Sequence, residues 1–277
     1  REPFMQRIMG MARKAITEYD MIQNGDRVAV GVSGGKDSVA LTMALHWLRR
    51  FIGIDYEVVA ITLDPCFGGV ECDYSPLAEL FEREGIEYVI KRTNIGRVVF
   101  DVREETNPCS LCSKMRRGAL HDTAKELGCN KIALGHHFND VIETTVMSMF
   151  YGSQLQAMPP KLHSTSFPGM TLIRPMYCIR EEDILAWKRY NELEFIQCAC
   201  RFTENCTMCD NGGGGSKRQE TKILLRRLKR DNPNIENSIF RSIHAVALDT
   251  MPGYKSEGVE HSFLERFHAQ EEAFNEE

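Results

Sequence analysis

The chain of 277 residues lacks any apolar run of about 18 residues, the length that a membrane-spanning helix needs. It also has little net charge, −5, which argues against a protein that coats nucleic acid through a generally basic surface. Charges interrupt the stretch 1–14, so no signal-peptide apolar core is visible there. We therefore expect a cytoplasmic protein with no membrane partner, in which any contact with nucleic acid uses a local basic face.

Disulfide bonds are not expected, although cysteine is frequent. Ten cysteines in a cytoplasmic protein more often serve metal or sulfur chemistry. With 43% hydrophobic residues, the chain is long enough to bury one large core or two modest ones.

The most informative stretch, Ser-Gly-Gly-Lys-Asp-Ser at 33–38, lacks both common nucleotide-loop patterns: it is neither a Walker A loop nor a GxGxxG motif. It follows the buried apolar run 28–32 and leads into a helical pattern. A strand, a glycine turn and a helix N-terminus in series bind phosphate through backbone amides and the helix dipole. The phosphate-binding residues would be Ser33, Gly34, Gly35, Lys36, Asp37 and Ser38, with Lys36 and Asp37 also acting in catalysis. The stretch resembles the PP-loop of ATP pyrophosphatases, which implies ATP as the cofactor and pyrophosphate as a product.

Apolar strand patterns alternate with helical patterns after this loop. Strands are expected at 57–63, 87–90, from 131 and at 172–176, and helices at 38–51, 77–84 and 181–190. The alternation predicts an α/β fold with a doubly wound, mainly parallel sheet of the PP-loop, Rossmann-like type. Ligands of such sheets bind beyond the carboxyl ends of the strands. Leu63, Gly135 and His136 are therefore expected to contact the nucleotide, although His136 and His137 also fit an ordinary loop pair.

Composition divides the chain into four expected segments. These are an N-terminal helix in 1–24, the ATP-binding domain in 25–195, a cysteine-rich and basic helical segment in 196–253 and an acidic tail in 254–277. The run Gly-Gly-Gly-Gly-Ser at 212–216 resembles a synthetic linker.

Cys109 and Cys112 form a CxxC motif that opens a basic helical pattern. Such a motif has three interpretations: a pair of metal ligands, a redox dithiol, or two unrelated buried thiols. The redox interpretation needs a thioredoxin-like context, which the predicted sheet does not provide. Lys114, Arg116 and Arg117 follow the motif as candidate RNA-binding residues, with an ordinary solvated helix face as the alternative. Further along, Asp140 and Glu143 offer the hard oxygen ligands that Mg²⁺ prefers on phosphates.

Five motifs together closely resemble the tRNA 2-thiocytidine synthetase family (TtcA-like). They are SGGKDS at 33–38, CSLCSKMRRG at 109–118, KIALGHH at 131–137, MFYG at 149–152 and MPPKL at 158–162. The resemblance implies ATP- and Mg²⁺-dependent thiolation of a cytidine in the tRNA anticodon loop. It also implies a [4Fe-4S] cluster held by three cysteines, of which Cys109 and Cys112 match the first two. The sulfur donor would be a cysteine desulfurase or sulfide, and a homodimer is one candidate oligomeric state.

Two positions depart from the family pattern. The family's HHRDD reads His-His-Phe-Asn-Asp at 136–140, which leaves Asp140 as the stronger metal and catalytic candidate. The family's late CxxC corresponds either to the region of Cys198 and Cys200 or to Cys206 and Cys209. We favour Cys200 as the third cluster ligand, then Cys198, then Cys209, because the first two follow an apolar pair that would end a strand.

Basic residues from three parts of the chain are expected to contact tRNA. The basic residues of the two helical segments are expected to form one positive face; they are Lys114, Arg116, Arg117, Lys217, Arg218, Arg226 and Arg227. Lys161 is a further RNA-binding candidate. Two other functions remain open from the sequence. One is a PP-loop thiolase acting on a tRNA uridine, and the other is a zinc-stabilised RNA-binding protein with a vestigial ATP site.

Overall fold

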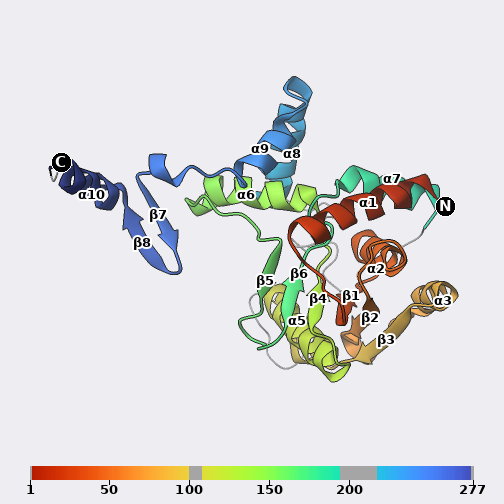
Figure 1. The fold of residues 1–277 in the computed structure, drawn as a ribbon. Helices are drawn as coiled ribbons and strands as arrows, with labels where there is room; N and C mark the ends of the chain where they lie inside the picture. The colour runs from red at the N-terminus through yellow and green to blue at the C-terminus, as the bar shows by residue number, and fades with distance from the viewer. Residues whose placement is uncertain (1, 100–107, 194–216, 276–277) are drawn as a thin grey trace. The chain divides into compact units, whose positions relative to one another are not determined.

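The computed structural model describes residues 2–99, 108–193 and 217–275 (Figure 1). Contacts between residues divide the chain into two units, Arg1–Arg226 and Arg227–Glu277. The N-terminal helix belongs to the first unit, and α8 continues from the first unit into the second. The division into four segments by composition stays a prediction.

The first unit is an alternation of helices and strands. In chain order they are α1 (Pro3–Glu18), β1 (Asp26–Gly31), α2 (Lys36–Leu48), β2 (Tyr56–Asp64), η1 (Phe67–Gly69), α3 (Ser75–Glu84), β3 (Glu87–Arg92), α4 (Ile95–Arg97), α5 (Pro108–Glu126), β4 (Lys131–Ala133), α6 (Phe138–Gly152), β5 (Lys161–His163), β6 (Thr171–Ile173), α7 (Glu181–Tyr190) and α8 (Lys217–Asp231). The short strand β5 is the one element of the sheet that the sequence pattern did not predict.

Six strands form one sheet in the order β3-β2-β1-β4-β6-β5. All neighbouring pairs are parallel except β5 and β6. Val28 of β1 lies opposite Val58 of β2 on one side and Lys131 of β4 on the other. This confirms the predicted mainly parallel α/β sheet, and the central place of β1 explains its unbroken apolar run.

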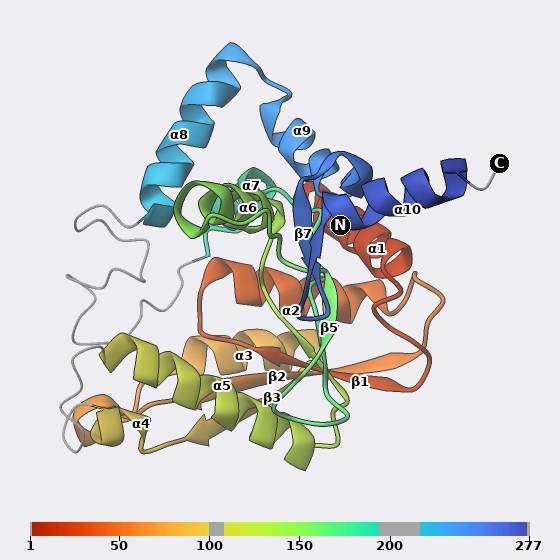
Figure 2. The ribbon, with the colours of Figure 1, turned by 90° about the vertical axis from the view of Figure 1, so that its left-hand side faces the viewer.

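Helices cover both faces of the sheet, with α2 on one side and α5 on the other (Figure 2). Leu120 of α5 packs so closely on β1 that a Cβ added at Gly31 would lie 2.8 Å from its Cδ2. On the opposite face, α2 is packed against β1 and β2 on one side and against α1 and α7 on the other. Its buried residues therefore go almost all round the helix, as expected of a helix enclosed within a domain.

The strand order changes direction at β1. The chain runs from β1 outward to β2 and β3, and then returns through α5 to β4 on the other side of β1. The loops that follow β1 and β4 therefore leave neighbouring strands at the same carboxyl edge of the sheet. Such a switch point is where open α/β sheets bind their ligands.

The second unit contains the remaining helices and a hairpin: α9 (Ile235–Ser242), η3 (Leu248–Thr250), β7 (Gly253–Ser256), β8 (Val259–Ser262) and α10 (Phe263–Asn275). The hairpin turns at Glu257 and Gly258, whose φ angles are 51° and 80°. Among the described residues of the whole chain, no helix is long and apolar enough to cross a membrane.

A buried ion pair fastens β4 to the amino end of β1. Lys131 Nζ lies 2.7 Å from Asp26 Oδ2 and donates a 2.6 Å hydrogen bond to Met21 O. Asp26 also accepts hydrogen bonds from Gln23 N and Asn130 Nδ2. Burial alone would raise the pKa of Asp26, but the Gln23 amide and Lys131 lower it below its ordinary value. Asp26 is therefore a fully partnered carboxylate in the native state.

We expect Lys131→Met to lower the free energy of unfolding by about 3–5 kcal/mol, because it leaves a buried carboxylate without its cation. Urea denaturation measures the change. Lys91→Met is the matched control: it breaks the exposed pair of Lys91 with Glu126 and should cost less than about 1 kcal/mol. Equal losses in the two variants would contradict the structural role of the buried pair.

Candidate active site

The loop between β1 and α2 has the predicted strand–turn–helix form. Gly34 has a φ of 92°, a conformation that glycine adopts at little cost. Gly35 is the N-cap of α2, where no side chain caps the helix. Ser33 is exposed, and its hydroxyl accepts a 3.4 Å hydrogen bond from Gly35 N. The first backbone amides of α2 therefore have no side-chain cap and can bind an anion at this helix end.

Lys36 lies between two carboxylates. Its Nζ is 3.2 Å from Asp37 Oδ2 and 3.3 Å from Glu181 Oε1, at the start of α7. Burial would lower the pKa of Lys36, but these carboxylates raise it above its ordinary value. Lys36 is therefore a charged ammonium group at the loop. A bound phosphate could replace one of the two carboxylates as its partner.

Asp37 is the one described residue with a buried side-chain oxygen atom, Oδ1, that lacks a hydrogen-bond partner. Burial raises the pKa of this carboxyl, although Lys36 and His137 act in the opposite direction. Buried polar atoms are nearly always bonded, so an unpartnered one suggests a missing ligand or ion. The donor set of Lys36, the α2 amides and this oxygen fits a nucleotide with its Mg²⁺.

The loop after β4 approaches the loop after β1. A Cβ added at Gly135 would lie 3.7 Å from atoms of Asp37, an ordinary contact distance. His137 is the N-cap of α6: its Nδ1 accepts from Asp140 N at 3.4 Å, and Asp140 Oδ2 accepts from His137 N at 3.0 Å. This reciprocal capping box fixes the start of α6 beside the phosphate loop. Asp140, the expected Mg²⁺ ligand, thus already bonds within the protein through Oδ2.

His136 is held by an arginine from the end of β6. Arg174 Nε donates a 3.3 Å hydrogen bond to His136 Nδ1, and Nη1 of the same arginine donates to Pro159 O. Burial, and then the Arg174 charge, lower the pKa of His136. His136 is therefore a neutral imidazole at neutral pH, suited to hydrogen bonding rather than to charge pairing with phosphate.

Glu143 lies one turn beyond Asp140 on α6 and is buried. Its Oε2 accepts a 3.0 Å hydrogen bond from Arg218 Nη1 of α8. Arg218 Nη1 is also 3.6 Å from Asp140 Oδ1. Arg218 was predicted to bind RNA, but in the structure it is paired with these two carboxylates.

The end of β2 carries Leu63, whose expected contact with the nucleotide stays a prediction. The side chain of Leu63 is packed in the core with Ile61, Ala124 and Ile132, so a contact with nucleotide there would have to use its backbone. The next residue, Asp64, is fully buried and accepts hydrogen bonds from Arg92, Cys66 N and Cys72 N. Its carboxylate therefore organises the loop after β2.

Cys109 and Cys112 both belong to α5, which begins at Pro108. Cys112 is buried and packs near Ile95 and Val99. Cys198 and Cys200 lie outside the described residues. Within the described part of the chain, no three His, Cys, Asp or Glu side chains gather as a metal site. The assignment of Cys109 and Cys112 as cluster ligands therefore stays a prediction.

The predicted RNA-binding residues are found in three places. Lys114 and Arg117 are exposed on α5, and Arg116 is half-buried there. Lys161 Nζ donates to Asp20 O, and Lys217 is paired with Glu220 while lying over the Tyr151 ring. Arg226 is exposed at the end of the first unit, and Arg227 belongs to the second. The single positive face remains a prediction.

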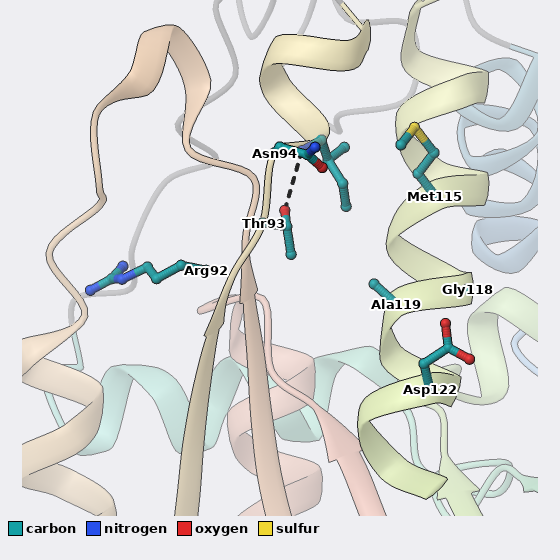
Figure 3. Close-up of a pocket in the computed structure, with 8 residues that line it drawn as sticks. Arg92, Thr93, Asn94, Met115, Gly118, Ala119 and Asp122 are labelled. Carbon is teal, nitrogen blue, oxygen red and sulfur yellow. Dashed lines mark hydrogen bonds between the residues drawn. The ribbon is translucent and has the colours of Figure 1, made fainter. Parts of the chain in front are cut away.

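A pocket of about 700 Å³ opens between the end of β3 and α5 (Figure 3). It is lined by Arg92, Thr93, Asn94, Ile95, Met115, Gly118, Ala119 and Asp122. Figure 3 shows the Arg92 guanidinium turned away from α5, consistent with its bond to Asp64. No residue of the phosphate loop lines this pocket.

Sequence patterns did not identify the partners of the predicted site residues. Glu181, which pairs with Lys36, gave only a helix-start signal, as part of an acidic first turn. Arg174 gave no signal at all. The pairing of Glu143 with Arg218 could not be found either, because the two residues are 75 positions apart.

The free energy of unfolding should depend on pH through the titration of the Glu143 carboxyl. Burial raises its pKa to about 7 from an ordinary 4.5, although Lys222 and Arg218 oppose the shift. Between these pH values the native state keeps a proton that the unfolded chain has released. Glu143 therefore makes stability fall as pH rises from 4.5 to 7, by about 3 kcal/mol at most.

We expect Glu143→Gln to remove this part of the slope when unfolding is measured at several pH values by chemical denaturation. Glu126→Gln, at an exposed position, is the control and should keep the wild-type slope. If Glu143→Gln also keeps the full slope, the buried carboxyl does not titrate as the geometry indicates.

Comparison with known proteins gives a consistent result. A family model of the PP-loop domain matches residues 6–201. The tRNA-cytidine(32) 2-sulfurtransferase of Citrifermentans bemidjiense is 36% identical over 242 residues, covering 87% of this chain and 90% of that protein. The protein of the same name from Geotalea daltonii is 37% identical over 243 residues, covering 87% and 92%.

A solved structure shares the fold. It is the U34-tRNA thiolase NcsA from Methanococcus maripaludis with its [4Fe-4S] cluster, with a TM-score of 0.67 and 24% identity. The match covers 91% of this chain and 81% of that one. The resemblance seen in the motifs is thus confirmed over most of the length. The chain belongs to the PP-loop family and, within it, to the tRNA-cytidine(32) 2-sulfurtransferase family.

Proposed function

We propose that this protein is an ATP-dependent tRNA sulfurtransferase that replaces the C2 oxygen of a cytidine in the tRNA anticodon loop with sulfur. The observation that carries the proposal is the identity of 36–37%, over 87% of the chain, to proteins named for this reaction. The phosphate loop with its charged lysine and unpartnered aspartate oxygen supports the ATP-using half. The cytoplasm is the location expected from the sequence.

The first chemical step is adenylation. The cytidine O2 attacks the α-phosphorus of ATP, a new P–O bond forms, and the bond to the β-phosphate breaks to release pyrophosphate. Lys36 and the amides of Ser33–Ser38 would stabilise the charge on the departing pyrophosphate. Asp37 and Asp140 would hold Mg²⁺, and Gly135 and His136 would contact the nucleotide beside Asp37. At Leu63 the contact would come from the backbone.

The second step exchanges oxygen for sulfur. A sulfur nucleophile adds to C2, a C–S bond forms, and the C2–O bond breaks so that AMP leaves with the oxygen. A [4Fe-4S] cluster held by Cys109, Cys112 and Cys200, with Cys198 as the next candidate, would supply the sulfur through its open coordination position. The sulfur itself would come from a cysteine desulfurase or from sulfide.

Contact with tRNA would use the exposed cations of α5. Lys114 and Arg117 follow the CxxC motif on the same helix, so RNA phosphates bound there would lie near the expected cluster. Arg116, Lys161 and Lys217 are secondary candidates. A homodimer would be compatible with this arrangement.

The direct test of the function is thiolation in vitro. Anaerobically purified protein, ATP, Mg²⁺, sulfide and unmodified tRNA should yield 2-thiocytidine, measured by mass spectrometry of the nucleosides. Lys36→Ala should reduce AMP formation at least about 100-fold while the fold is retained, because a charge that stabilises the leaving group is lost. Lys91→Ala, at an exposed position, should remain active.

Other outcomes would decide against the proposal. Appearance of 2-thiouridine in place of 2-thiocytidine would identify a uridine thiolase. Absence of both products would exclude tRNA thiolation, and AMP release unchanged in Lys36→Ala would exclude the proposed role of Lys36.

The cluster ligands can be tested separately by iron content. Cys109→Ala, Cys112→Ala and Cys200→Ala, purified without oxygen, should each lose most of their iron and their broad visible absorbance. Cys129→Ala is the control, because that thiol is buried in the core beside Ile132. A full cluster in Cys200→Ala together with loss in Cys209→Ala would show the third ligand to be wrong. A colourless, zinc-containing wild type would favour the RNA-binding alternative.

A further inference from the structure

Arg218 connects the first turn of α8 to the first turns of α6. Its Nη1 lies 3.0 Å from Glu143 Oε2 and 3.6 Å from Asp140 Oδ1. Its Nη2 donates a 3.3 Å hydrogen bond to Thr144 Oγ1. One guanidinium thus spans three side chains of a helix that is distant in the sequence.

The two carboxylates need a cation because they are close to each other and shielded from water. They lie three positions apart on α6, and residues at this spacing are neighbours on a helix surface. The side chain of Glu143 is 4% exposed and that of Asp140 is 22% exposed. Repulsion between them is therefore screened less than it would be at a fully exposed site.

Asp140 is close enough to the phosphate loop to act on the charge of Asp37, and Glu143 lies one turn further along α6. Asp140 caps α6 through His137, and Gly135 of the same loop approaches Asp37. A triphosphate held by Lys36 and the α2 amides would therefore bind in the field of Glu143 and Asp140. Lys222 also opposes the negative charge of Glu143, so without Arg218 that field would be only partly compensated and would repel the polyphosphate.

We propose that Arg218 is a positioning residue of the ATP site, which fixes the carboxylates of Glu143 and Asp140 and compensates their charge so that ATP can bind. The inference rests on the ATP-using half of the proposed function. It replaces a direct tRNA contact as the role of Arg218, because the guanidinium is already engaged by α6.

The test compares the ATP affinities of variants, measured in the presence of Mg²⁺. Arg218→Met should weaken ATP binding about tenfold, and Arg218→Lys, which keeps the charge, should weaken it less. Glu143→Gln in the Arg218→Met background should restore affinity to within about threefold of wild type, because the uncompensated charge is removed.

Arg83→Met is the matched control. Arg83 is an exposed arginine of α3 in a loose pair with Glu84, so the variant loses the same charge without touching α6, and ATP affinity should stay unchanged. Circular dichroism and thermal melting check that each variant folds. A purely structural role for Arg218 would give a double variant that is no better than Arg218→Met.

Three outcomes would overturn the inference. They are unchanged ATP affinity in Arg218→Met, a loss that Glu143→Gln does not relieve, and a variant whose only defect is weaker tRNA binding with a smaller salt slope. The last would assign Arg218 to tRNA phosphate. Failure of the wild type to bind ATP would instead count against the proposed function, which keeps the two results distinguishable.

Discussion

The site depends on the approach of two loops at the carboxyl edge of the sheet. β1 and β4 are neighbours, so the phosphate loop and the loop carrying His136 and His137 start side by side. Glycine at 135 leaves room there, since even an added Cβ would remain at 3.7 Å from Asp37. The protein itself therefore has room for a Cβ atom at this point.

Short-range patterns identified the loops, and tertiary packing determined their partners. The segment Ser33–Ser38 could be recognised because strand, turn and helix start follow one another within a few residues. Glu181 and Arg218 could not, because their contacts with Lys36 and Glu143 depend on how α7 and α8 pack. The direction of the Leu63 side chain could not be predicted for a related reason. A strand buried on both faces has no polar alternation that tells which side chains point into the core.

The charges of the site are balanced in pairs rather than left free. Lys36 is shared by Asp37 and Glu181, and Arg218 is shared by Glu143 and Asp140. Each cation therefore meets two carboxylates, a local excess of negative charge. A polyphosphate that enters such a site can replace a carboxylate at Lys36, and the Mg²⁺ that accompanies it offsets part of the excess negative charge. Charge balance thus links binding of nucleotide and metal.

The charged side chains at the two edges of the sheet differ in how completely they are hydrogen-bonded. At the amino edge, Asp26 and Lys131 satisfy each other, and Arg27 bonds to Leu127 O, Glu57 and Glu87. At the carboxyl edge, Asp37 keeps an unpartnered buried oxygen. Buried polar groups without partners cost stability, and natural proteins retain them where function requires them. The strand pairing secured at one edge holds β1 and β4 together, so the loops at the other edge can remain incompletely bonded and available to a ligand.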